Sequence, residues 1–413
     1  MNYSEKIGYS WIPKGLEKIG LLGFVILVIF NKSVFKIRFL EWSIGAICFA
    51  AILAFIVVRG KIKKKQLLVI SLPLMWTIYS LMTFFAAYNS DHHLSNLIVV
   101  VILNLISVSA VMCTFTRKES RNRIILHTAI LWVSINFVIW LLWVIGIYEF
   151  ENTDFSGLFR NRNTFAMQTI FLVSLVMFFA NSRRYLSFSL IAISLLMVAS
   201  SLSVKGFVFS FFVIFYPKYL KSSFKKKVVI VVTGLTFFAC AYAAFPKMQD
   251  RMIRFAMVFT DSSSLRQKES AFLRAWLMEE GVELIIKNPV FGVGVDNARF
   301  LLIPPYLQGV SDEGLVSHNN YIEVALNSGL PGLFLFYLPL LYIFFNTKKS
   351  HPYWVEIKTL TLLYILAGIA SVQYNEFMSI MKYYIIVFLY FYPLNNISNR
   401  YGRYYMLNTA KIL

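Results

Sequence analysis

The chain has 413 residues, of which 58% are hydrophobic and only 15% are charged, and its mean hydropathy is +0.65. A soluble domain of this length would need a more highly charged surface, so the composition excludes that class and indicates a polytopic membrane protein. The formal net charge of +20 would suggest nucleic acid in a soluble protein. Here the basic residues lie mostly in short loops, where membrane topology explains them, and we expect no nucleic-acid partner.

Apolar runs long enough to cross a hydrocarbon core of about 30 Å recur from one end of the chain to the other. We therefore expect an all-α protein with about twelve transmembrane helices in a single membrane domain, residues 1–413. The spans are predicted at residues 17–31, 39–58, 66–88, 94–115, 124–146, 164–181, 186–203, 206–220, 228–245, 325–346, 359–379 and 381–394.

Clusters of lysine and arginine decide the expected orientation of these spans. The strongest clusters fall on alternate connections, which places those connections and both termini in the cytoplasm. They lie at residues 59–65, 117–123, 183–184, 221–227 and 348–349. The basic group at residues 31–38 lies on the predicted outer side. It is weaker than the neighbouring basic clusters, so we expect those clusters to determine the orientation.

The longest connection, residues 246–320 between the ninth and tenth spans, is predicted to lie outside and to be partly helical. Its acids and bases nearly balance, so its arginines need an explanation other than topology. Residues 264–287 predict an amphipathic helix, which Asn288-Pro289 ends, and residues 291–294 predict a tight turn. The apolar side of this helix is expected to comprise Ala271, Leu273, Trp276, Leu277, Val282, Leu284, Ile285 and Ile286.

His318 lies at the end of that outer connection, where the next span is about to begin. An imidazole with a near-neutral pKa is the natural general base for a hydroxyl nucleophile. The alternative interpretation is a histidine at the membrane interface that is satisfied by its neighbours. Glu323 follows about one helical turn later, close enough to orient or polarise the ring. Because His318 follows Arg274 in this connection, we favour the general base.

Two arginines of the outer connection are candidates for binding an anion. Arg274 lies on the predicted amphipathic helix, and guanidinium groups bind diphosphate through paired, directional hydrogen bonds. The alternative is a solvated helix face on which Arg274 pairs with Glu279 and Glu280. Arg266 is the weaker candidate of the two.

Further cations lie at the predicted outer ends of other spans. Arg160 and Arg162 alternate with Asn161 and Asn163 where the sixth span begins, so they form an anion-binding mouth at the positive end of that helix. The alternative interpretation is that Arg160 and Arg162 are ordinary positive residues flanking a transmembrane helix and bind no anion. Lys205 lies between the seventh and eighth spans, where a charge is costly unless it reaches water or meets an anion.

Several other kinds of site find no support in the sequence. Walker, His-Glu-x-x-His and Gly-x-Ser-x-Gly motifs are absent, and no Asp-x-Asp pair could hold a divalent ion beside a sugar nucleotide. We therefore predict neither a metal nor a cofactor. Charges within the spans lie near their ends, whereas a coupled transporter usually keeps ionisable residues in mid-membrane.

What remains is an outward-facing site with several arginines and one histidine at a lipid boundary. Arginines there would neutralise a diphosphate whose lipid tail lies between helices, and the histidine would deprotonate an acceptor. This chemistry is glycosyl transfer from a lipid diphosphate carrier.

Short motifs between residues 150 and 345 resemble, in order and spacing, those of the O-antigen ligase and polymerase superfamily. They are Gly157-Leu158-Phe159 with Asn161 and Asn163, Arg274-Ala275-Trp276, Asn288-Pro289 with Gly292-Val293-Gly294, and His318-Asn319 followed by Gly329-Leu330-Pro331-Gly332. The resemblance implies a GT-C-like membrane fold and an undecaprenyl diphosphate-linked glycan donor. It also implies that Arg160 or Arg162 binds the donor together with Arg274 and that His318 is the base. We further expect Asn319 and Glu323 to contact substrate. Lys205 departs from the family's usual arginine, which puts its bidentate contact in doubt.

The resemblance leaves the acceptor open. A ligase moves the finished glycan onto the lipid A core, whereas a polymerase adds the growing chain to a new repeat unit. One outer loop dominates here and no arginine–glycine repeat occurs in a second one, so we favour a ligase over an O-antigen or capsule polymerase. A lipid-linked glycan flippase is a more distant alternative, because the spans offer little polar lining. In each case the expected location is the bacterial inner membrane, among membrane lipids, with the site facing outward.

Overall fold

A computed structural model describes residues 64–391 with internal gaps, and every regular element in these residues is a helix. The gaps are residues 116–117, 149–154, 158–160, 181–183, 245, 247–248, 251–252, 254–256, 258–269, 305–313, 370, 372 and 374–376. The spans predicted at 17–31 and 39–58 lie outside the described part of the chain.

Each predicted span within the described residues corresponds to a helix. The helices are α3 (Lys64–Met82), η1 (Thr83–Ala86), α4 (Ser90–Phe115), α5 (Lys118–Val144), α6 (Arg162–Phe179), α7 (Arg184–Ser200), α8 (Val204–Lys221), α9 (Phe224–Ala244), α11 (Ser270–Lys287), η3 (Asn297–Phe300), α12 (Asn320–Asn346), α13 (Trp354–Gly368) and α14 (Phe377–Phe391). The boundaries differ by several residues at a number of ends, and most at α13, which ends at Gly368, well short of the predicted residue 379. The backbone N–H of Gln373 instead donates to the side chain of Asn320, 2.6 Å away, so it serves a tertiary contact.

Four described helical segments are long and apolar enough to cross a membrane. They are Ser90–Val108, Arg121–Val144, Arg162–Phe179 and Asn320–Asn346. Shorter apolar helices cover Ser71–Ala86, Tyr185–Ser200 and Ser379–Phe391. The total of about twelve spans and the outer position of the long connection therefore remain predictions.

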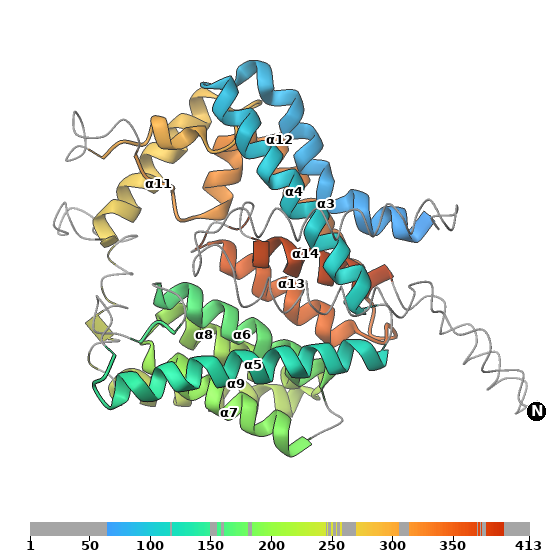
Figure 1. Ribbon diagram of the computed structural model, residues 1–413, viewed down its shortest axis with the longest axis vertical. Helices are drawn as coiled ribbons and strands as arrows, with labels where there is room; N and C mark the ends of the chain where they lie inside the picture. Colours follow the sequence, from blue (N-terminus) through green and yellow to red (C-terminus); the bar gives the residue numbers. More distant parts are fainter. Residues whose placement is uncertain are drawn as a thin grey trace, which may run out of the picture.

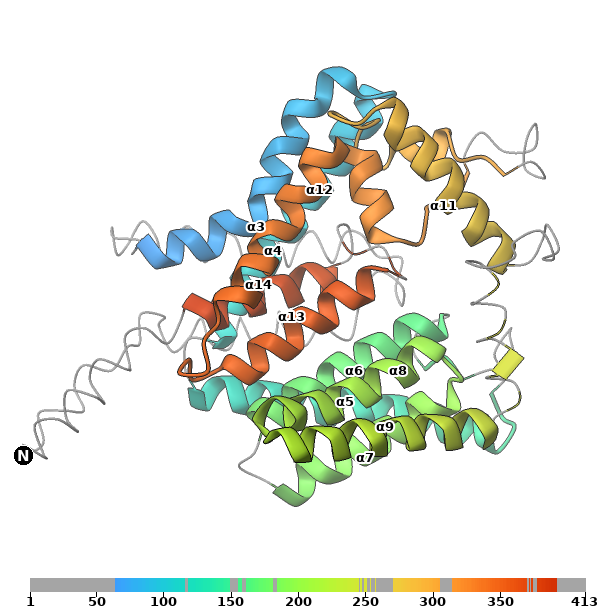
Figure 2. The same ribbon diagram turned by 180° about the vertical axis from the view of Figure 1, so that it is seen from behind.

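The described helices form two groups that are joined by a third (Figures 1 and 2). Helices α5 to α9 pack side by side in one group, and α3, α4 and α12 form the other. Helices α13 and α14 lie between them, with α13 in contact with α8 and α14 in contact with α3 and α4. The residues near the start of α12 are thereby brought toward α6, α8 and α14.

Helix α11 has the amphipathic character that the sequence predicts, and its apolar side packs on the first half of α12. Leu277 of α11 and Ile322 of α12 belong to one buried cluster. A methyl group on Gly281 would lie 2.7 Å from a side-chain carbon of Ile322, so the two helices approach closely there. The predicted apolar side was too wide, because Val282 and Ile286 are 46% and 70% exposed.

Helix α12 is broken at Ser328 and Gly329, where φ of the glycine is +70°. The carbonyl oxygens of Leu326 and Asn327 therefore lose their helical partners. The backbone N–H groups of Val293 and Gly294 replace them at 2.7 and 3.2 Å. The tight turn expected at residues 291–294 thus fixes a kink beneath the start of α12.

Candidate functional site

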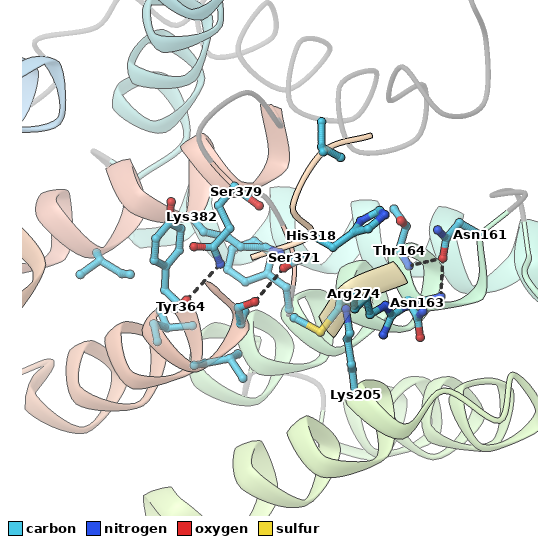
Figure 3. Close-up of a pocket in the computed structure, with 18 residues that line it drawn as sticks. Asn161, Asn163, Thr164, Lys205, Arg274, His318, Tyr364, Ser371, Ser379 and Lys382 are labelled. Atoms are coloured by element: carbon cyan, nitrogen blue, oxygen red, sulfur yellow. Dashed lines mark hydrogen bonds between the residues drawn. The ribbon is translucent and has the colours of Figure 1, made fainter. Parts of the chain in front are cut away.

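A cavity of about 250 Å³ lies where α6, α8, α11, α13 and α14 meet the segment before α12 (Figure 3). Its wall contains three of the predicted site residues, Lys205, Arg274 and His318, together with Asn161 and Asn163 of the motif at the start of α6. The full lining is Asn161, Asn163, Thr164, Met167, Phe171, Lys205, Arg274, Val316, His318, Leu360, Leu363, Tyr364, Ala367, Ser371, Gln373, Ser379, Lys382 and Ile386. Side chains far apart in the sequence are therefore gathered in one place.

His318 has a left-handed backbone conformation, with φ of 55°. This conformation is uncommon for a residue with a side chain and persists only where neighbours enforce it. Two of those neighbours are polar residues on either side of it. The side chain of Asn319 caps α12 by accepting from the N–H groups of Tyr321 and Ile322 at 2.9 and 3.4 Å. The hydroxyl of Ser317 donates to the carbonyl of Asn319 at 2.9 Å.

Glu323 also fixes the segment that contains His318, through a hydrogen bond with Ser317. Its carboxylate is buried and accepts a hydrogen bond from the N–H of Ser317 at 2.9 Å. Neither Glu323 nor Asn319 is among the residues that line the cavity. Asn319 bonds backbone groups of α12 and Glu323 bonds Ser317, so both hold the segment that carries His318, and their predicted substrate contacts stay predictions.

The surroundings of His318 lower the pKa of its imidazole to about 4. The largest cause is loss of hydration, followed by the positive charges of Arg274 and Lys205. The side chain is nevertheless exposed at the cavity wall, so the two positive charges act on a ring that water can still reach. The ring is therefore neutral at physiological pH and can accept a proton, although its pKa is lower than the near-neutral value that the sequence led us to expect.

Arg274 projects from α11 toward the cavity, between His318 and the start of α6 (Figure 3). Loss of hydration and the nearby charge of Arg162 lower the pKa of its guanidinium. Its Nε atom is buried and has no hydrogen-bond partner among the described residues. Repulsion between two guanidinium groups that lie close together is relieved when an anion binds between or beside them.

The first turns of α6 and α8 are tied together at the cavity. Asn161 caps α6 by accepting from the N–H groups of Asn163 and Thr164 at 2.9 and 3.4 Å. Asn163 in turn accepts a hydrogen bond of 2.8 Å from Ser203, the residue that caps α8. Two positive helix ends and the side chain of Lys205 therefore point toward one region, which favours negative charge there.

Two predicted cations lie outside the described residues, and one lies beside the cavity. Arg160 and Arg266 fall in the gaps at 158–160 and 258–269, so their proposed roles stay predictions. Arg162 is the first residue of α6 and is not part of the cavity wall. It is nevertheless close enough to Arg274 for its charge to act there.

Helices α13 and α14 contribute a wall of the cavity that was not predicted. Lys382, Ser379 and Gln373 all line the cavity, and Lys382 is a charge near the start of the last predicted span, 381–394. A lysine within an apolar helix is costly and is in itself a signal of function. Gln373 could have been found from the short polar segment that separates the last two apolar runs of the sequence.

The cavity lining is cationic at some points and apolar at others. Lys205, Arg274 and Lys382 contribute positive charge, and no aspartate or glutamate occurs in the lining that the structure describes. Phe171 and Ile386 belong to its apolar part. In the same described residues, no group of three or more histidine, cysteine or acidic side chains is placed to hold a metal ion. Such a lining suits an anion attached to an apolar chain.

Comparison with known families gives one match. The family described as O-Antigen ligase matches residues 168–337, from within α6 to within α12, and this region contains Lys205, Arg274 and His318. No curated protein matches the chain. Apolar helices and this family together indicate a bacterial inner-membrane protein of polysaccharide biosynthesis. The match supports the O-antigen ligase superfamily as the family of this chain.

Proposed function

We propose that this protein is a glycosyltransferase that moves a glycan from undecaprenyl diphosphate to a hydroxyl of the lipid A core, on the outer face of the inner membrane. The family supports glycan transfer of the ligase or polymerase type. The donor, the acceptor and the side of the membrane are parts of the proposal.

The observation that carries the proposal is the meeting of Arg274, Lys205 and His318 in one cavity that also has an apolar wall. A lipid diphosphate carries two negative charges or more beside a hydrocarbon chain, and this lining is complementary to both features. The neutral imidazole supplies the proton acceptor that a hydroxyl nucleophile needs.

In the proposed reaction the acceptor oxygen attacks the anomeric carbon of the glycan. The bond between that carbon and the diphosphate oxygen breaks as the new carbon–oxygen bond forms, and the hydroxyl proton passes to His318. Arg274 and Lys205 stabilise the charge that develops on the departing diphosphate, as cations in a site of restricted hydration do effectively.

We favour a ligase over a polymerase because a single outer connection dominates the sequence. A strain that lacks the gene distinguishes them through its glycolipids. If the protein is a ligase, we expect the glycan polymer in this strain to remain on the carrier lipid and to be absent from the lipid A core. A core that bears one repeat unit would identify a polymerase instead, and normal surface glycan would contradict both activities.

A further inference from the structure

Lys382 lines the cavity but lies beyond the part of the chain that the family resemblance covers. It belongs to α14, and Ser379 and Ile386, three residues before and four after it, line the same cavity. Residues at this spacing share one face of a helix. The wall that α14 contributes is therefore a stripe with a hydroxyl, an ammonium group and an aliphatic side chain in succession.

Part of the surroundings of Lys382 is apolar. It lies within Ser379–Phe391, an apolar helical segment, and its Nζ is 4.9 Å from the ring centroid of Phe171 in α6. Phe171 is 2% exposed. A cation in such surroundings is strongly attracted to an anion that enters the cavity, because little water screens the two charges.

Figure 3 separates the polar side chains of the cavity into two sides. Lys382, Ser379 and Tyr364 lie on the side of α13 and α14, whereas Arg274 and Lys205 lie with the ends of α11 and α8. A diphosphate also has two distinct ends, because one phosphate carries the glycan and the other carries the lipid chain.

We propose that Lys382 binds the phosphate group next to the lipid chain, while Arg274 and Lys205 hold the phosphate next to the glycan. Phe171 and Ile386, beside Lys382, then contact the first part of the chain. His318 lies on the side of Arg274, where the glycan bond breaks. This assignment rests on the proposed function and adds a donor-binding residue to it.

A polyprenyl monophosphate isolates one end of the donor, because its single phosphate is the one next to the chain. The experiment measures the dissociation constants of undecaprenyl monophosphate and undecaprenyl diphosphate for the full chain in phosphatidylcholine nanodiscs. We expect Lys382→Met to weaken binding of both lipids by about tenfold or more, the effect of losing a charge-assisted hydrogen bond. Lys382→Arg, which keeps the charge, should stay within about threefold of the unchanged protein.

Two further variants control for general effects of charge and folding. Lys227 of α9 is also half-buried, with its Nζ 4.9 Å from the ring centroid of Tyr219, but it is not part of the cavity wall. Lys227→Met should therefore leave both dissociation constants unchanged. Arg274→Met should weaken binding of the diphosphate and spare the monophosphate.

The outcomes separate this assignment from the proposed function. If Lys382→Met binds the monophosphate as well as the unchanged protein does, the assignment is wrong and the proposed function stands. Equal losses in Lys382→Arg and Lys382→Met would also overturn it, because a packing role would then explain both. Failure of the unchanged protein to bind undecaprenyl diphosphate would overturn the proposed function as well.

Discussion

The backbone N–H of Ser317 donates a 2.9 Å hydrogen bond to Oε2 of Glu323, across the residue that we propose as the base. Glu323 is only 1% exposed, so water cannot readily take the place of its carboxylate in this hydrogen bond. Together with the cap that Asn319 places on α12, this bond fixes the backbone of His318 in its left-handed conformation. The geometry of the base thus depends on a buried acid that touches no part of the cavity.

The first prediction concerns this acid. Glu323→Ala leaves the N–H of Ser317 buried without a partner, at a cost of about 1–3 kcal/mol, and frees the segment that holds His318. We expect the turnover number to fall strongly and the midpoint of thermal unfolding to drop. Glu323→Gln keeps an acceptor oxygen and should restore most of both. If the glutamine variant is as impaired as the alanine variant, the positioning role is wrong.

The predicted residues that lie together in the cavity are those whose type and position disagreed with topology. Arg274 lies in a connection with no need for positive charge, and His318 lies at its end, so chemistry was the natural explanation for both. The same reasoning did not single out Lys382, because a lysine near the end of a span is usually explained by its reach to water. Only the tertiary structure, in which Nζ of Lys382 lies over the ring of Phe171, shows that its side chain lines the cavity.

The fold was predictable in outline because apolar runs in a membrane form helices, and less so at boundaries that tertiary contacts decide. The end of α13 at Gly368 depends on Gln373 bonding to Asn320, a contact that no local pattern contains. Asn319 illustrates a second limit. Asparagine is favoured both at substrate contacts and at helix caps, and the sequence cannot say which of these roles a given asparagine has.

The second prediction tests the close contact of α6 and α8 that brings their first turns to the cavity. A methyl group on Gly206 would lie 2.5 Å from Cβ of Ala166. Gly206→Ala should therefore push the helices apart, cost about 1–3 kcal/mol of stability and reduce activity. The double variant Ala166→Gly with Gly206→Ala removes the opposing methyl group and should recover much of the loss. Unfolding midpoints of the purified variants measure both effects, and an unchanged midpoint in Gly206→Ala would contradict the contact.

The third prediction concerns pH. His318 acts as a base only when its ring is neutral, and its lowered pKa of about 4 keeps it neutral at higher pH. The kcat/KM of the unchanged protein should therefore stay level between about pH 7 and about pH 5 and fall only below that range. Lys205→Met removes one of the charges that lower the pKa, so its acid limb should move to higher pH.

The control for this shift is Lys227→Met, which removes a lysine outside the cavity and should leave the profile unchanged. The position of the acid limb is the decisive quantity, because the loss of a phosphate contact alone would lower kcat/KM at every pH. Coincident acid limbs for Lys205→Met and the unchanged protein would show that His318 does not govern the profile.

The fourth prediction addresses the two residues assigned to chemistry. His318→Ala removes the proton acceptor, which typically lowers the rate by about a hundredfold or more. Arg274→Ala removes a guanidinium group from the diphosphate site. Both variants should lose surface glycan in cells while their amounts in the membrane stay normal, as measured by immunoblot and glycolipid gels. Normal glycan in either variant would remove that residue from the mechanism.

The fifth prediction is that glycan transfer survives removal of divalent ions. Arg274, Lys205 and Lys382 place three positive charges around the proposed diphosphate, and cations of this kind stabilise a leaving diphosphate as a metal ion does elsewhere. The purified protein in nanodiscs should therefore transfer glycan at an unchanged rate after treatment with EDTA. A metal-dependent glycosyltransferase in the same buffer serves as the control and should stop. If added Mg²⁺ or Mn²⁺ proved strictly necessary, the side chains of this cavity would not be sufficient to neutralise the leaving group, and the role given to Arg274 would be wrong.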